Sequence, residues 1–200
     1  GCETTMQALA AGAVSFVTKP KLGLKDFLED RSNGLVEAVK AAARANLNAL
    51  QQRPAARPAG VPQAAAAACA ARPAGAMAET TDRVIAIGIS TGGVQSIETV
   101  LKTLPRTLPG MVVVQHMPEK FTGAFASRLN SLYELDVMEA KDGDRVINGR
   151  MLIAPGGRHM RLKRSGAQYV VEVSDGPLIN HHRPSVDVLF RSVAQCAGRN

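Results

Sequence analysis

A serine and a histidine follow two successive apolar runs of the sequence. Ser90 lies in GISTGG (88–93) and His116 lies in QHMP (115–118), each directly after its run. Parallel strands of an open α/β sheet point their carboxyl ends at one crevice, so we expect the two side chains to meet there. A serine hydroxyl needs a neighbouring base to become a nucleophile, and histidine suits that duty near pH 7. The pair therefore predicts half of a hydrolytic centre.

The glycine turn around Ser90 admits three interpretations. G-x-S-x-G is the nucleophile elbow, a sharp strand-to-helix turn that exposes the serine oxygen. In that case Thr91 and the backbone N–H groups beside it are candidates to stabilise a developing oxyanion. A dinucleotide loop is disfavoured, because Ser90 replaces the central glycine of GxGxxG and the second run ends in Gln115-His116 without an acid. An ordinary glycine turn is the structural alternative.

The second half of the chain, 81–200, alternates strand and helix patterns and predicts one α/β domain with a doubly wound parallel sheet. A β-hairpin is expected near its end, joined through Ser165-Gly166. The expected strands are 84–89, 111–115, 135–139, 151–154, 160–163 and 169–173, and the expected helices are 93–104, 122–132 and 185–197.

Two other regions precede this domain. Residues 1–50 have a helical pattern over 3–10, an apolar strand over 14–17 and a long helical pattern from about 24 to 50, which Asn33-Gly34 could split. They predict a β-α unit of an incomplete domain. Residues 51–80 are rich in Ala, Pro, Gly and Arg and lack large side chains, so they predict an extended linker. The alternative is a short alanine helix over 64–68.

Composition narrows the function classes. The 200 residues are 46% hydrophobic and 20% charged, as in globular proteins. The net charge of +7 is spread along the chain and aromatics are only 4%, which argues against nucleic-acid binding but leaves an acidic protein partner open. No apolar run suggests membrane insertion or a signal segment, so we expect a cytoplasmic protein.

The remaining histidines and cysteines predict little chemistry of their own. The three scattered cysteines suggest reduced thiols, and the four histidines lack metal-site spacing, so no metal is expected at the Ser–His pair. His181-His182 with Arg183-Pro184 is most simply a surface loop before the last helix. Alternatively this loop lines the crevice, with Arg183 contacting substrate.

Four motifs in order resemble the bacterial chemotaxis protein-glutamate methylesterase family, CheB. They are GISTGG (88–93), VQHMP (114–118), IAPG with HM (153–160) and RPSVDVLF (183–190). The stretch from Ala8 to Pro20, ending in VTKP, resembles the last third of the flavodoxin-like receiver domain that this family carries before a linker and the esterase domain. The resemblance thus covers nearly the whole chain.

The resemblance implies a role for each matching residue. It implies that Ser90 is the nucleophile, His116 the general base and Thr91 a neighbour of the oxyanion site. Lys19 resembles the receiver lysine that senses a phosphoryl group, although an exposed lysine is the plain alternative. The implied reaction is hydrolysis of glutamate γ-methyl esters on methyl-accepting chemoreceptors, and many members also deamidate glutamine. A chemotaxis histidine kinase is the implied phosphodonor, Mg²⁺ is implied for receiver phosphorylation only, and the esterase needs no cofactor.

Two departures from the family pattern make us expect a fragment cut at both ends. The family's catalytic aspartate lies in a glycine-rich turn that would follow Asn200, and the receiver's phosphate-accepting aspartate with its acidic magnesium cluster would precede Gly1. We therefore expect these 200 residues alone to be nearly inactive. Asp187, at the start of the last helix, is better explained as a helix cap. The alternative function is a phosphorylation-dependent, non-catalytic module that binds the receptor.

Overall fold

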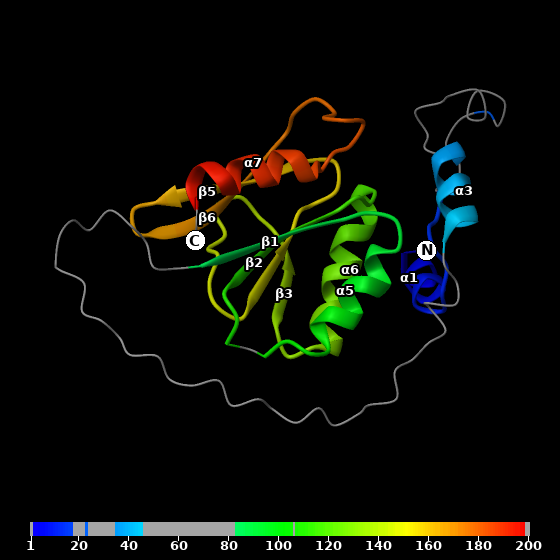
Figure 1. Cartoon of the computed structure of the whole chain (residues 1–200), viewed down its shortest axis with the longest axis horizontal. Coiled ribbons are helices and arrows are strands. Elements are labelled where there is room, and N and C mark those ends of the chain that lie inside the picture. Colours follow the sequence, from blue (N-terminus) through cyan, green and yellow to red (C-terminus); the bar gives the residue numbers. More distant parts are fainter. Residues whose placement is uncertain (1, 18–22, 24–34, 46–82, 106, 199–200) are drawn as a thin grey trace.

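The computed structural model describes residues 2–17, 23, 35–45, 83–105 and 107–198 (Figure 1). The predicted linker, 51–80, and Lys19 lie outside these residues. The helices are α1 (Cys2–Ala10), α3 (Leu35–Arg44), α5 (Gly93–Leu101), α6 (Glu119–Leu132) and α7 (Val186–Cys196). The strands are β1 (Val84–Ile89), β2 (Gly110–Gln115), β3 (Asp136–Glu139), β4 (Arg150–Ile153), β5 (His159–Ser165) and β6 (Gln168–Ser174).

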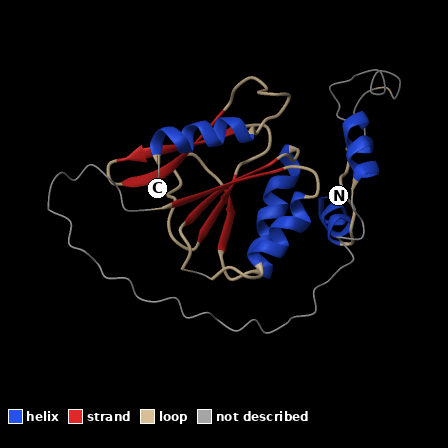
Figure 2. Ribbon diagram, viewed as in Figure 1, coloured by secondary structure: helices blue, strands red, loops and turns tan. Residues whose placement is uncertain are grey.

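Four strands form a parallel sheet in the order β1-β2-β4-β3, with helices on both faces (Figure 2). The predicted doubly wound α/β fold is therefore confirmed. Every residue of β2 is buried, because this strand is paired on both edges and covered on both faces. Such strands read as continuous apolar runs in the sequence.

Alternate side chains of β2 pack into two separate hydrophobic cores. Met111 and Val113 pack with α5 and α6, whereas Val112 and Val114 pack with α7 and the hairpin. This division arises because successive side chains of a strand point to opposite faces of the sheet. Phe125 of α6 is fully buried in the first core, and such a side chain stabilises the fold by roughly 1.5–3 kcal/mol.

The predicted hairpin consists of β5 and β6, which pair antiparallel from His159↔Ser174 to Ser165↔Gln168. Gly166, at its turn, has φ of 60°, a backbone conformation that glycine adopts without steric cost. The hairpin packs against α7 (Figure 1). This layer holds α7, and with it the β6–α7 loop, over the end of the sheet where Ser90 lies.

The prediction of a strand over residues 14–17 is wrong. This segment is irregular, because the carbonyl oxygen of Val14 accepts a hydrogen bond from Gly92 N at 3.3 Å instead of joining a ladder. The preceding helix, α1, buries Met6 and Leu9 in the same core as α5 and α6. Of the long helix expected from 24 to 50, the structure describes α3.

Helix boundaries differ modestly from the expected ones. α6 begins at Glu119, three residues before the expected start at Thr122. The apolar pattern did not reveal this start, because Glu119 and Lys120 are exposed polar residues. α5 ends at Leu101 rather than residue 104. Among the described residues no helix is both long and apolar enough to span a membrane.

Candidate active site

The parallel pairing of β1 and β2 brings Ser90 and His116 together. Ile89 and Gln115 are register partners, and His116 N donates to the Ile89 carbonyl at 3.1 Å. The next residue on each strand is therefore one of the pair, and Ser90 Oγ lies 3.2 Å from His116 Nδ1. At this distance the imidazole can take the hydroxyl proton directly. The arrangement can thus activate a serine nucleophile.

Gln115 ties the two loops together, and sequence reasoning missed this role. Its side chain is 4% exposed, and Nε2 donates to the carbonyl oxygens of Ser90 at 3.1 Å and His116 at 3.2 Å. These two bonds hold the backbone of Ser90 against that of His116. The sequence did contain a signal for this role, which is an amide side chain at the end of an otherwise apolar strand. A buried amide needs hydrogen-bond partners.

Glycines make the turn after Ser90 possible. Gly92 has φ of 76°, in the left-handed region. At Gly93 a Cβ atom would lie 2.3 Å from Gln115 Oε1, so a side chain there would displace the amide that joins the loops. The two glycines let α5 start at Gly93, three residues after Ser90, as the elbow pattern predicts.

The surroundings of His116 favour its neutral form. Its pKa is lowered to about 4. Burial is the main cause, the nearby imidazole of His182 also lowers the pKa, and the carboxylate of Asp187 opposes both effects. A general base must be unprotonated to accept a proton. His116 is therefore kept in its basic form through the whole neutral range.

The second ring nitrogen of His116 has no partner within the described part of the chain. When Nδ1 accepts from the Ser90 hydroxyl, the proton of the neutral ring sits on Nε2. Nε2 is buried and makes no hydrogen bond with any described residue. A buried donor of this kind normally has an acceptor, so the geometry calls for one on this side of the ring.

Residues 9–16 cover the cavity in front of Ser90. Leu9, Val14, Ser15 and Phe16 line it together with residues of the β1–α5 turn, Thr91 among them. Its volume is about 70 Å³, well below the ~300–1,000 Å³ of typical ligand pockets. With this segment in place, the cavity is too small for a substrate side chain and its backbone.

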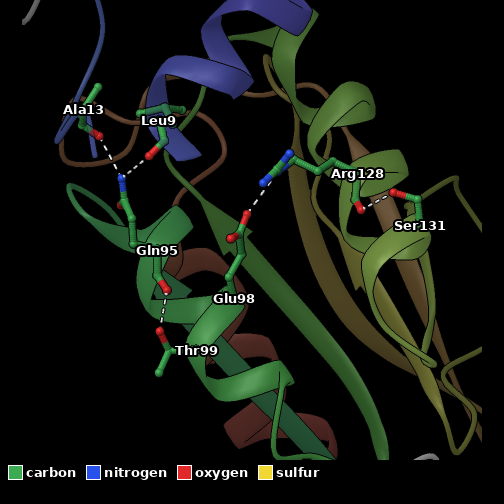
Figure 3. A network of polar contacts seen from close by, with 7 residues as sticks. All are labelled: Leu9, Ala13, Gln95, Glu98, Thr99, Arg128 and Ser131. Carbon is green, nitrogen blue, oxygen red and sulfur yellow. Dashed lines mark hydrogen bonds and ion pairs between the residues drawn. The ribbon is translucent and has the colours of Figure 1, made fainter. Parts of the chain in front are cut away.

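Hydrogen bonds and rings hold the covering segment in place. Gln95 Nε2 donates to the carbonyl oxygens of Leu9 at 2.7 Å and Ala13 at 2.8 Å (Figure 3). The ring of Phe16 lies against Phe121 of α6, with centroids 4.6 Å apart. Glu98 and Arg128 form an ion pair at 3.1 Å that joins α5 to α6 (Figure 3).

The other predicted site residues are placed differently. Arg183 is exposed, its Nη1 donates to the Gly176 carbonyl at 2.6 Å, and it does not line the cavity. From the same loop His182 stacks on His116. Asp187 lies in the first turn of α7 and accepts from the Asn180 side chain. Within the described ranges no three His, Cys, Asp or Glu side chains group as metal ligands.

Comparison with known proteins agrees with the geometry. Residues 85–200 match the family model of the CheB methylesterase. The chain is 60% identical over 202 residues to protein-glutamate methylesterase/protein-glutamine glutaminase 2 of Albidiferax ferrireducens. It is 60% identical over 200 residues to protein-glutamate methylesterase/protein-glutamine glutaminase 1 of Photobacterium profundum. All of this chain aligns, but it spans only 56% and 57% of those two relatives.

A solved structure resembles part of the chain. The CheB methylesterase catalytic domain of Thermotoga maritima is 40% identical, with a TM-score of 0.56 over 57% of this chain and 61% of that one. The fold, the order of motifs and the family match agree. The chain belongs to the CheB methylesterase family.

Proposed function

We propose that Ser90 and His116 are the nucleophile and base of a protein-glutamate methylesterase that also deamidates glutamine. The observation that carries this proposal is the 3.2 Å contact between Ser90 Oγ and His116 Nδ1 at the start of α5. The names of the relatives support the substrate class. The protein substrates we propose are methyl-accepting chemoreceptors.

The proposed reaction has two steps. His116 takes the proton of Ser90, whose oxygen attacks the ester carbonyl, and backbone N–H groups beside Thr91 stabilise the negative oxygen. The bond to the methoxy group breaks, and His116 gives its proton to the departing methoxide oxygen, which leaves as methanol. Water then attacks the acyl-enzyme with His116 again as base, which releases the glutamate carboxylate and restores Ser90. With glutamine the departing group is ammonia.

We propose an aspartate as the third member of this centre, from a segment outside these 200 residues. Its carboxylate would accept the proton of His116 Nε2, which has no acceptor within the described residues. In serine proteases, loss of the orienting carboxylate lowers turnover by about 10⁴-fold. We therefore expect the 200-residue chain to hydrolyse methylated receptor about 10³–10⁴-fold more slowly than the full-length protein. Equal turnover numbers in a methanol-release assay would contradict the third residue.

We propose that the N-terminal region is part of a receiver domain that regulates the esterase. Residues 9–16 narrow the cavity at Ser90, and Gln95 binds two of their carbonyl oxygens. Phosphorylation of the receiver by a chemotaxis histidine kinase, sensed through Lys19, would shift this segment and admit substrate. The contact at Gln95 provides a direct test that needs no phosphodonor.

The variant Gln95→Ala is expected to raise the basal activity of the unphosphorylated full-length protein. It removes two hydrogen bonds to the covering segment, each worth about 0.5–1.5 kcal/mol, so we expect the basal rate to rise by about fivefold or more. Thr99→Ala is the matched control, because Thr99 is exposed on the same helix and bonds only its own helix, at Gln95 O. A basal rate that is unchanged or reduced in Gln95→Ala would contradict the proposed regulation.

The experiment that tests the proposed function compares two products. Full-length protein is incubated with methylated receptor and, separately, with receptor that carries glutamine at the same sites. Methanol release from the first and ammonia release from the second establish both activities. Receptor binding without either product would instead indicate a non-catalytic regulatory module.

A further inference from the structure

We infer that His182 is a positioning residue of the esterase, whose ring covers one face of His116 and holds it toward Ser90. This inference rests on the proposed function. The ring centroids of His182 and His116 are 3.7 Å apart and the ring planes differ by 14°. The two imidazoles are therefore in parallel stacking contact over their faces.

The loop that carries His182 has a defined conformation. Ile179 and His182 exchange two backbone hydrogen bonds, at 3.1 and 3.0 Å, around Asn180 and His181. Both central residues have positive φ, 50° and 64°, which is the two-residue turn that closes tight hairpins. Positive φ is uncommon for residues other than glycine, although asparagine and histidine adopt it more often than most. A conformation of this kind persists only where its surroundings enforce it.

A side-chain contact anchors the turn to the neighbouring helix. Asn180 Nδ2 donates to Asp187 Oδ2 in the first turn of α7. α7 is in turn packed on β1 and on the hairpin. His182 is thus supported from α7 and by its own turn, while His116 is carried by β2. The stacking contact therefore joins the β6–α7 loop to the end of β2, two segments that are distant in sequence.

Stacking has two consequences for a catalytic base. It removes water from one face of the His116 ring and restricts rotation of the ring, so that Nδ1 stays near Ser90 Oγ. It also places a second titratable ring against the first, which disfavours a positive charge on either ring. Both effects act on the geometry and the protonation of the group that must accept the serine proton.

Few charged groups act on His116. Among the described residues these are His182, from the β6–α7 loop, and Asp187, from α7, whose carboxylate opposes it. His181 acts on the neighbouring His182. Of the described residues that line the cavity, His116 alone carries an ionisable side chain. Burial, the larger cause, and His182 both lower the pKa of His116. Removal of the His182 ring exposes His116 and removes the repulsion, so both changes raise this pKa toward its ordinary 6.5.

The test compares His182→Ala and His182→Phe with the control His181→Asn in the full-length protein. His181→Asn alters the adjacent histidine but keeps a residue that tolerates positive φ. For His182→Ala we expect kcat for methanol release to fall by on the order of ten- to a hundredfold with little change in KM. The acid limb of the pH profile of kcat/KM moves to higher pH. His182→Phe keeps a stacked ring and recovers most of kcat.

A second measurement does not depend on activity. The C–H signals of the His116 ring are followed by NMR titration in the 200-residue chain. His182→Ala is expected to raise the pKa of His116, and His181→Asn to leave it nearly unchanged. If His116 titrates alike in the wild type and in His182→Ala, the inference is overturned, whatever the assays show.

The kinetic outcomes separate this inference from the proposed function. A uniform loss of kcat in His182→Ala with an unmoved acid limb, or a rise in KM alone, overturns the positioning role. The second of these results would instead make His182 a substrate contact. A wild-type protein that releases neither methanol nor ammonia would refute the proposed function, while the NMR titration would still decide the placement of His182.

Discussion

Ser90→Ala is expected to lower methanol release from methylated receptor by about 10⁴-fold or more, since removal of a catalytic serine costs this much in hydrolases of this type. The expected loss is large because the proposed mechanism requires this hydroxyl to form the covalent bond to the substrate, and among the described residues no other hydroxyl bonds His116. Ser90 is exposed, so the change should leave the free energy of unfolding nearly unaltered. The measurement is the initial rate with the full-length protein.

A serine-directed fluorophosphonate probe gives the same test without a receptor. It should label the wild-type protein at Ser90 and fail to label Ser90→Ala, and labelling should be strongly reduced in His116→Ala. Ser131→Ala is the matched control, because Ser131 is also exposed and its hydroxyl bonds only the carbonyl of Arg128 on its own helix. A Ser90→Ala protein that retains a tenth of the wild-type rate would rule out Ser90 as the nucleophile.

Gly156→Ala is expected to lower the free energy of unfolding by about 3 kcal/mol, the upper part of the range for overpacked sites. A Cβ atom at this position would lie 2.4 Å from both Glu119 N and Glu119 Cα. Those atoms are backbone, at the start of α6, and cannot rotate away as a side chain could. The chain must shift where α6 begins, three residues after His116. Urea denaturation followed by circular dichroism measures the loss of stability.

The same displacement should reach Ser90 and His116, so the proposed esterase activity should fall in Gly156→Ala as well. Gly123→Ala is the control, since a Cβ there would be 3.2 Å from the end of the Glu139 side chain, which can move aside. Gly123 lies within α6, where alanine is favoured over glycine by about 1 kcal/mol. Stability in Gly156→Ala equal to that of the wild type would show that the contact at Glu119 is not maintained in solution.

The pairing of Ser90 with His116 could be predicted because it depends on local features. Two apolar runs predict two buried strands, a glycine turn predicts the sharp exit after the first, and adjacent parallel strands end at one edge of a sheet. The structure adds the register, with Ile89 opposite Gln115, which places the two side chains within hydrogen-bond distance. The hairpin and the final helix were predictable for the same reason, since each has its own period and turn residues.

Other features had no local signal. The segment 14–17 has the composition of a strand, yet its backbone bonds the turn after Ser90, because a strand exists only where a neighbour pairs with it. The two histidines of the β6–α7 loop suggested only a surface loop or a crevice wall. The stacking of His182 on His116 required the packing of α7 against β1.

The sequence by itself determined the order of elements, the α/β class and which serine and histidine follow two adjacent strands. These follow from residue type and from periods of two and 3.6 residues, which act over short stretches of chain. Tertiary structure alone decided that Gln115 joins the two loops, that residues 9–16 narrow the cavity and that Gly156 lies against the start of α6. Each of these contacts joins segments distant in the chain, and their position depends on how the helices and the sheet pack as a whole.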